Sequence, residues 1–246
     1  MPIRFSAFGR VFAPSWAMTL AVLLLLALFV SLGRWQWHRG EAKRQTWADF
    51  EREMRLPPVD APPRLDDAPR YQAIRMRGHF DGQHQFLLDN RFLKGNVGYE
   101  VLTPFTLTDG RRVLVNRGWV PFLGYRDKLP DIALSGESLA DELTVTGRLD
   151  ELPTAGLASG RAPPTTNASW PKLTSFPTHE ELVLALRDKL ERRVVLMTTG
   201  GPDNFEREWS PPGLPPDRHF SYAIQWWGFA LVLLVLYFGL NFRKVP

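Results

Sequence analysis

Trp16 to Leu32 reads WAMTLAVLLLLALFVSL, an uncharged apolar run of 17 residues near the N-terminus. Tyr222 to Leu240 reads YAIQWWGFALVLLVLYFGL, a second uncharged run of 19 residues near the C-terminus. At about 1.5 Å of rise per residue, helices of these lengths reach roughly 25 to 29 Å, close to a hydrocarbon core of about 30 Å. The two runs therefore predict one transmembrane helix at each end of the chain and a single folded domain between them.

Basic residues at Arg4 and Arg10 precede the first run, so a cleaved signal peptide is the alternative interpretation of it. The run is longer than the usual signal-peptide core of about 7 to 15 residues. Arg34, Trp35 and Trp37 follow at once, which is typical of a membrane helix anchored at the interface. We therefore expect the first helix to be retained.

The distribution of charge predicts how the two helices are oriented. Residues 1–15 and 241–246 hold two basic residues each and no acid, whereas all 26 acidic residues lie between the two runs. The positive-inside rule places both tails in the cytoplasm, because long domains cross largely regardless of their charge. We expect a two-pass protein of the cell inner membrane with a cytoplasmic tail, a membrane helix, a periplasmic domain, a second membrane helix and a cytoplasmic tail at residues 1–15, 16–33, 34–221, 222–240 and 241–246.

The composition excludes several classes of function. The chain has no cysteine, so it can form neither disulfides nor the thiolate sites used for thiol exchange or copper transfer. The basic isoelectric point near 9.6 is mostly due to the two tails, so no nucleic-acid partner is expected. The sequence contains no G-x-S-x-G, P-loop, H-E-x-x-H or dinucleotide-binding glycine pattern, so we do not expect an enzyme.

Between the apolar runs, the pattern predicts a membrane-anchored α+β fold. Residues 34–55 favour a helix that continues out of the membrane, with Trp35, Arg39 and Lys43 four residues apart on one face. That face either fixes the helix at the interface or contacts a partner. The Pro-rich connector at 56–69 predicts no regular structure, and residues 153–171 and 200–217 read as Pro- and Gly-rich loops.

Alternating stretches predict a mostly antiparallel sheet or small barrel with one or two helices. The expected strands lie at 73–80, 85–88, 99–107, 112–120, 143–149 and 193–198, with a hairpin turn at Asp109-Gly110. Residues 178–181 fit a capping box. They begin a helix that is expected to pack on the sheet through leucines at steps of four, namely Leu182, Leu186 and Leu190.

Histidines in the domain give weak signals for chemistry. His79 and His84 flank Asp81 and Gly82, a spacing that permits two metal ligands. The alternative that we adopt is a polar hairpin turn with two exposed imidazoles. His179 lies inside the capping box and is expected to be exposed, whereas His38 lies just outside the first membrane helix.

The entry to the second membrane helix carries a more specific pattern. His219, Tyr222 and Trp226 are spaced i, i+3 and i+7, so a helix places them on one face, with Arg218 beside them. An imidazole can coordinate haem iron, aromatic rings can cover the macrocycle, and a guanidinium can pair with a propionate. The structural alternative is an ordinary aromatic belt in which His219 caps the helix or reaches the interface.

Five short stretches, taken in chain order, carry a resemblance to a known family: LGRWQWHR at 32–39 with Lys43, GHF at 78–80, GYEVLTPF at 98–105, VLVNRGWVP at 113–121, and DRHFSYA at 217–223 with Trp226. Over nearly its whole length the chain resembles the Surfeit-locus (Surf/Shy) family of cytochrome c oxidase assembly factors. VLVNRGWVP is the most specific of the five.

This resemblance implies a non-enzymatic role in building the haem-containing catalytic subunit of a terminal oxidase. It implies haem a as cofactor, and the haem a synthesis enzyme as a second candidate partner. The family's proposed ligand, the histidine of its N-R-H motif, corresponds to His219. Asp217 stands where Asn is usual and Gln225 where a smaller hydroxyl residue is common. A scaffold that stabilises an oxidase subunit without binding haem stays open as the alternative.

The motif Asn116-Arg117-Gly118-Trp119 permits two interpretations. In the structural one, Gly118 allows a turn or close approach at a strand end, Trp119 fills the core and Arg117 is paired. In the functional one, the motif forms a surface that contacts the oxidase or the haem edge. We favour the structural interpretation.

Overall fold

The computed structural model describes residues 5–7, 10–125, 128–134, 142–155, 160–201 and 203–244 of the 246-residue chain. The chain forms two compact units, one made of Met1–Ala48 with Gly213–Pro246 and the other of Asp49–Pro212. Residues 34–48 and 213–221, which the sequence assigned to the domain between the membrane helices, thus belong to the helical unit. Arg4 of the N-terminal tail lies outside the described residues.

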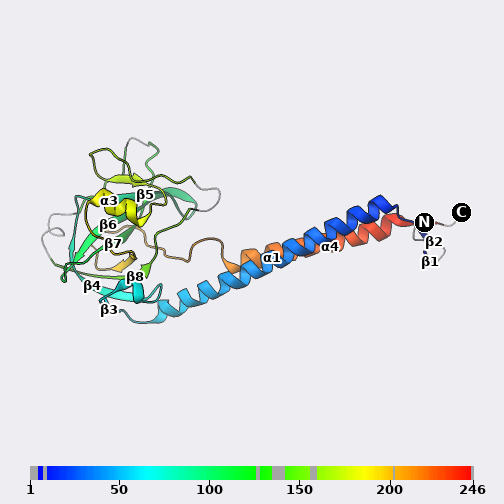
Figure 1. Cartoon of the computed structure of the whole chain (residues 1–246), viewed down its shortest axis with the longest axis horizontal. Coiled ribbons are helices and arrows are strands. Elements are labelled where there is room, and N and C mark those ends of the chain that lie inside the picture. The colour runs from blue at the N-terminus through cyan, green and yellow to red at the C-terminus, as the bar shows by residue number, and fades with distance from the viewer. Residues whose placement is uncertain are drawn as a thin grey trace. The chain divides into compact units, whose positions relative to one another are not determined.

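Two long helices make up most of the helical unit (Figure 1). Helix α1 spans Trp16–Arg55 without interruption, which confirms both the predicted apolar helix and its continuation through residue 55. Ser15 caps its start, since Ser15 Oγ accepts a hydrogen bond from the amide of Met18 at 3.2 Å. Helix α4 spans Pro216–Asn241 and has proline in its first turn, where no amide donor is needed. Both helices are long and apolar enough to cross a membrane.

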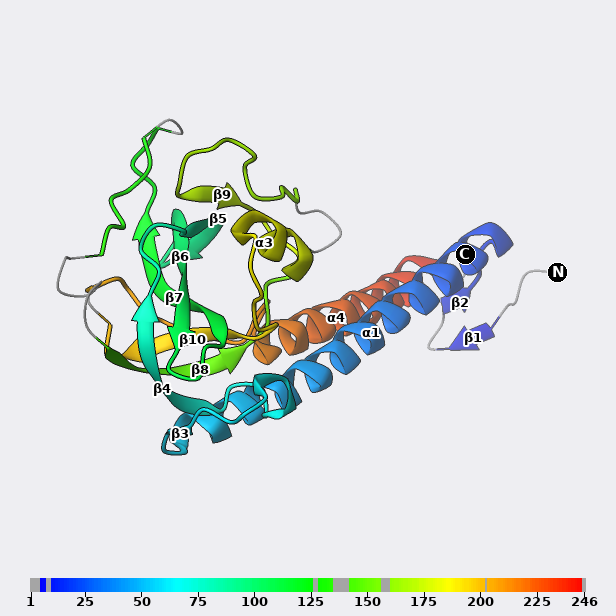
Figure 2. The same cartoon turned by 60° about the vertical axis from the view of Figure 1, so that its left-hand side comes forward.

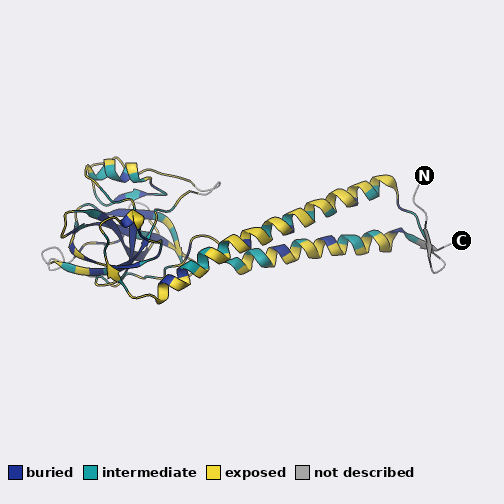
Figure 3. Ribbon diagram, turned by 60° about the horizontal axis from the view of Figure 1, so that its bottom comes forward, coloured by how far each residue is buried: buried dark blue, intermediate teal, exposed yellow. Residues whose placement is uncertain are grey.

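The two helices pack against each other along a regular seam. On α1 the half-buried and buried positions recur at alternating steps of four and three: Val22, Leu26, Phe29, Gly33, Gln36, Gly40 and Lys43. On α4 they are His219, Ala223, Trp226 and Ala230. A spacing of 3.5 residues per turn is the pattern of a left-handed coiled coil. In Figure 3 the buried and half-buried residues of both helices, in dark blue and teal, interrupt the exposed yellow surface at regular intervals.

Glycines on α1 allow the close approach of the two helices. A Cβ added to Gly33 would overlap the indole of Trp227, and one added to Gly40 would overlap the ring of Phe220. The glycines Gly228 and Gly239 of α4 are not such points, because an added Cβ at either position meets nothing within 4 Å.

Three short strands lie together at the end of the helical unit that carries both termini (Figure 1). β1 (Phe5–Ala7), β2 (Arg10–Phe12) and β11 (Phe242–Lys244) form a three-stranded antiparallel sheet.

Within the second unit, an eight-stranded sheet follows the order β3-β4-β8-β10-β7-β6-β5-β9. An additional pairing between β4 and β6 closes five of these strands into a barrel (Figure 2).

The barrel strands are β4 (Ala73–Phe80), β6 (Asn96–Leu107), β7 (Arg112–Pro121), β8 (Leu143–Asp150) and β10 (Val194–Thr199). The sheet continues through β3 (Val59–Asp60), β5 (Phe86–Leu93) and β9 (Lys172–Thr174). Only the β7–β10, β3–β4 and β5–β9 pairs are parallel among the described strands. The predicted small, mostly antiparallel barrel is therefore confirmed.

Alternation along β7 separates two parts of the core. Val113 and Val115 point into the barrel and join a cluster with Ile74, Met76 and Val195. Leu114, between them, points outward into a second cluster beneath α3 (His179–Leu186). Because side chains alternate across a strand, one strand can serve both faces. Every residue of Arg112–Pro121 except its two end positions is accordingly buried.

Three details differ from the expectations. The Pro-rich connector contains β3 and a 3-10 turn at Leu65–Asp67, because two of its residues pair with β4. Helix α3 starts with the predicted capping box, but it ends at Leu186 with Arg187 in the left-handed region. Leu190 lies beyond the helix, although it still packs on the second cluster. Strand β9 is one the sequence did not predict.

The end of α1 is held on the barrel by a buried arginine. Arg148 of β8 donates hydrogen bonds from Nη1 to the carbonyl of Glu53 at 2.6 Å and from Nη2 to that of Met54 at 3.0 Å. These carbonyls belong to the last turn of the helix, where intrahelical amide donors run out. The carbonyl of Glu53 also accepts from the amide of Leu56 at 3.2 Å. Phe50 adds an edge-to-face contact with Tyr71 at 5.0 Å between ring centroids. The final turn of α1 is thus part of the barrel unit.

Candidate functional site

His219 lies in the first turns of α4 and faces the seam of the helix pair. Its Nδ1 is 2.9 Å from Oε1 of Gln36 on α1, and its side chain is half-buried. Nε2 forms no hydrogen bond to any residue in the described part of the chain. The imidazole is therefore held by a hydrogen bond at Nδ1, whereas Nε2 has no hydrogen-bond partner within the described residues.

Aromatic rings fill the seam around this polar pair. Trp37 contacts Phe220 at 4.8 Å and Trp227 at 5.7 Å between ring centroids. Phe29 contacts Trp226 at 5.7 Å, on the side nearer the middle of the apolar run. The Gln36–His219 pair is thus a half-buried polar layer between aromatic contacts.

The other residues predicted around His219 are only partly gathered there. Trp226 is half-buried against Phe29. Tyr222 is 42% exposed, and Arg218 is exposed beside it. Asp217 and Arg218 form no ion pair with each other in the described structure. The exposed guanidinium and phenol lie on α4 next to an anchored imidazole, so the predicted chemical groups are present on one helix end.

The predicted face of Trp35, Arg39 and Lys43 is divided between two environments. Trp35 is 57% exposed and Arg39 is exposed, as expected for residues at an interface. Lys43 turns toward the seam and lies half-buried beside Gly213. His38 is exposed.

His84, one of the two histidines for which the sequence permitted a metal site, contacts a carboxylate. No group of three or more histidine and acidic side chains in the described part of the chain could hold a metal ion. His84 Nδ1 lies 2.8 Å from Asp81, which also binds Arg112 at 2.6 Å. The segment between β4 and β5 is not a hairpin turn, because these strands pair with β6 and not with each other.

His179 corrects another expectation. Its side chain is 18% exposed, and Nε2 lies 2.8 Å from the carbonyl oxygen of Leu190. The imidazole therefore fastens the segment that follows α3 and is not freely exposed. His79 is exposed on β4, as predicted.

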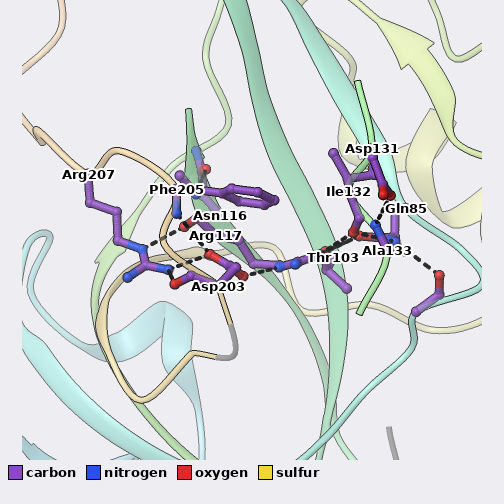
Figure 4. A network of polar contacts seen from close by, with 12 residues as sticks. Gln85, Thr103, Asn116, Arg117, Asp131, Ile132, Ala133, Asp203, Phe205 and Arg207 are labelled. Atoms are coloured by element: carbon purple, nitrogen blue, oxygen red, sulfur yellow. Dashed lines mark hydrogen bonds and ion pairs between the residues drawn. The ribbon is translucent and has the colours of Figure 1, made fainter. Parts of the chain in front are cut away.

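The Asn116–Trp119 motif lies inside β7 and is buried. Arg117 is fully buried, and its Nε donates to Asp203 at 2.7 Å (Figure 4). Its Nη1 donates to Gln85 at 2.7 Å and to the carbonyl of Ile132 at 3.0 Å. Burial lowers the pKa of the Arg117 guanidinium, and the negative charge of Asp203 opposes that shift. The arginine is therefore a structural cation held by a carboxylate.

The rest of the motif fastens the segment Asp203–Trp209, here called the strap, to the barrel. Gly118 has φ of +135°, and a Cβ there would overlap Phe205 and the carbonyl of Glu206. Trp119 exchanges backbone hydrogen bonds with Glu206 at 2.8 and 3.3 Å. Arg207 binds both the carbonyl of Arg117 and the carboxylate of Asp203 at 2.6 Å.

The side chains of Asn116 and Trp119 bind residues of the strands β6 and β5. Asn116 donates to Glu100 at 2.7 Å, and the Trp119 indole donates to the carbonyl of Arg91 at 3.1 Å. All four motif residues have little exposed surface, so their contacts support the structural interpretation over a partner surface.

The sequence analysis did not identify the partners of His219 or of the Asn116–Trp119 motif. Gln36 lies in the stretch at 32–39, to which only the family resemblance was assigned. It could have been identified as a polar residue at a seam position where the pattern is otherwise apolar. Asp203 and Arg207 lie in a stretch expected to be a loop. Nothing local marks them, because their role depends on contacts with β7, about 90 residues earlier.

Fold and site together define the class: a small closed barrel joined in one chain to a pair of long apolar helices that bury a histidine–glutamine contact. The family model described as SURF1 family matches residues 23–231. The chain belongs to the SURF1 family.

Curated relatives agree with this assignment. A SURF1-like protein of Rickettsia felis is 25% identical over 230 residues, covering 89% of this chain and 94% of the relative. Surfeit locus protein 1 of Rattus norvegicus is 25% identical, covering 92% of this chain and 76% of the relative. The cytochrome oxidase assembly protein SHY1 of Saccharomyces cerevisiae is 31% identical over 94 residues, which is 36% of this chain and 24% of that protein.

Proposed function

We propose that this protein is a non-enzymatic assembly factor for cytochrome c oxidase that binds haem a through His219 and aids its insertion into the catalytic subunit. The family and the name of the yeast relative support the role in oxidase assembly. The observation that carries haem binding is the state of His219, whose Nδ1 is held by Gln36 while Nε2 is uncommitted within the described chain.

The groups on the first turns of α4 suit haem as a cargo. A neutral imidazole nitrogen is a common axial ligand of haem iron. Tyr222 and Trp226 offer aromatic surface to the macrocycle, and the exposed Arg218 can pair with a propionate. The chain's own task is to hold the imidazole, supply apolar cover and neutralise a carboxylate.

We further propose that α1 and α4 anchor the protein in the inner membrane with both tails cytoplasmic and the barrel periplasmic. The length and composition of the helices support the anchoring. The orientation rests on the four basic residues of the tails and the absence of acids there. Haem would then be bound beside an apolar phase in which it is readily dissolved. The haem a synthesis enzyme is a second proposed partner, from which such a cargo would be received.

A scaffold that stabilises an oxidase subunit without haem is the second candidate function. One observation favours it: the Gln36–His219 contact gives both side chains a structural role without any ligand. A polar pair in an otherwise apolar seam specifies the register of two helices.

An optical spectrum separates the two functions. The full-length protein is purified in detergent from cells that make haem a, with His219→Ala and the control His38→Ala, an exposed histidine of α1, prepared in parallel. We expect a reduced α-band of bound haem a in the wild type and in His38→Ala, and its loss or shift in His219→Ala. Absence of stoichiometric haem from all three, with oxidase assembly still dependent on the protein, would establish the scaffold instead.

A further inference from the structure

Gln36 occupies a position where the pattern of the helix pair calls for an apolar or small residue. From Val22 to Gly40, the other seam positions of α1 are Val, Leu, Phe or Gly. An amide here loses hydrogen bonds to water on packing, and it must recover them from the facing helix. In the described structure the facing group is the imidazole of His219.

This contact has a chemical consequence for the imidazole. In a neutral histidine one ring nitrogen carries the proton and the other carries a lone pair, and the hydrogen bond at one nitrogen determines which is which. Oε1 of Gln36 is an acceptor and lies 2.9 Å from Nδ1. The proton is therefore held at Nδ1, and the lone pair is left at Nε2.

We propose that Gln36 is a positioning residue for His219: its Oε1 accepts the Nδ1–H hydrogen bond and thereby presents Nε2 as the ligand atom. The inference rests on the proposed ligation of haem by His219. Histidines that bind metals usually donate their other N–H to an oxygen acceptor, which fixes the tautomer and the ring orientation. Here the acceptor comes from the other helix, so the ligand is complete only in the paired state of α1 and α4.

The alternative is that Gln36 only sets the register of the helices. The chain offers a matched control, because a second polar contact crosses the same seam. Thr19 Oγ1 lies 2.7 Å from the hydroxyl of Tyr237, far along both helices from His219. Tyr237→Phe removes this contact without touching the imidazole. A register role is shared by both contacts, whereas a positioning role belongs to Gln36 alone.

The first test needs no haem. The full-length protein, labelled with ¹⁵N in its histidine rings, is placed in detergent micelles, and the ring nitrogens of His219 are assigned by comparison with His219→Ala. We expect the proton on Nδ1 in the wild type, in Tyr237→Phe and in Gln36→Glu, which keeps an acceptor. Gln36→Leu should shift the proton toward Nε2. A wild-type proton on Nε2 would overturn the proposal.

The second test measures haem affinity by titration of the same four proteins. We expect Gln36→Leu to bind haem about 10- to 100-fold more weakly, the usual effect of losing such an acceptor. Tyr237→Phe should bind like the wild type, and Gln36→Glu should restore binding with a lower reduction potential. Thermal unfolding of each apoprotein checks that the variants fold.

The outcomes distinguish failure of the proposed haem binding from failure of the positioning role of Gln36. If the wild type binds no haem, the proposed function fails, whatever the tautomer. If wild type and Gln36→Leu bind haem equally, or Tyr237→Phe weakens binding as much as Gln36→Leu, the positioning role fails while haem binding stands.

Discussion

Buried arginines are the residues that most clearly connect sequence to structure. The buried guanidinium of Arg117 donates hydrogen bonds to a carboxylate, an amide oxygen and a backbone carbonyl in place of water. The guanidinium of Arg148 donates to backbone carbonyls in the last turn of α1. A buried guanidinium is stable only with such partners. The VLVNRGWVP stretch was recognised from the sequence, and a paired Arg117 was expected. Its partner Asp203 was beyond prediction, since no local pattern relates residues so far apart in the chain.

Removing the Arg117 side chain takes a cation out of a buried polar network, and it leaves Asp203 with Arg207 as its charged partner. We expect Arg117→Met to lower the free energy of unfolding by about 3 to 5 kcal/mol, as for other broken buried pairs. The control is Arg52→Met, since Arg52 is 65% exposed and its ion pair with Asp49 contributes less than about 1 kcal/mol. Denaturant unfolding in detergent, followed by tryptophan fluorescence, measures both. Equal midpoints would contradict the assigned role of Arg117.

Asp81 makes part of the stability depend on pH. Burial alone raises the pKa of Asp81, but hydrogen bonds from His84 and Arg112 outweigh it and hold the pKa below its usual value. The ionised form therefore adds stability above the unfolded-state pKa of about 3.9, and this is lost as pH falls through the folded-state pKa. We expect the melting temperature of Asp81→Asn to be lower than that of the wild type at neutral pH and to converge with it in acid. The exposed Asp66, changed to Asn, is the control, and a gap that persists unchanged in acid would refute the idea.

At the scale of elements, the periodic patterns predicted most helices and strands correctly. Local sequence determines the apolar runs, the alternating strands and the capping box. These features could therefore be predicted. The short strands β3 and β9 and the end of α3 at Leu186 were not, because the first two exist only through pairing with β4 and β5. The seam of α1 was also within reach, since its steps of four and three are written in the sequence.

The seam predicts where the helix pair tolerates bulk. Gly33→Leu should weaken the packing of α1 against α4 by about 1 to 3 kcal/mol, because the larger side chain overlaps Trp227. Gly228→Leu should leave pairing intact, since a Cβ there meets nothing within 4 Å. The chain has no cysteine, so a pair introduced at Thr19 and Tyr237 can be joined by a short bifunctional reagent. Similar cross-linking yields in both glycine variants would exclude the packing assigned to Gly33.

At the scale of the whole molecule, the proposed orientation in the membrane predicts the activity of reporter fusions. With both tails cytoplasmic, green fluorescent protein fused after Pro246 should fluoresce, and alkaline phosphatase at the same site should be inactive. A phosphatase inserted at Gly110, in the exposed β6–β7 turn, should be active. The opposite result for these fusions would reverse the proposed topology.

The strand order also governs when the protein can acquire its shape during synthesis. β10 lies between β7 and β8, so neither of those strands has its second neighbour until residues 194–199 are available. The strap that pairs with Arg117 is made later still, because Asp203 follows β10 in the chain. Until β10 is made, any sheet that the earlier strands form has open edges at β7 and β8, and open strand edges invite aggregation. A premature stop before residue 194 accordingly leaves a sheet that cannot close.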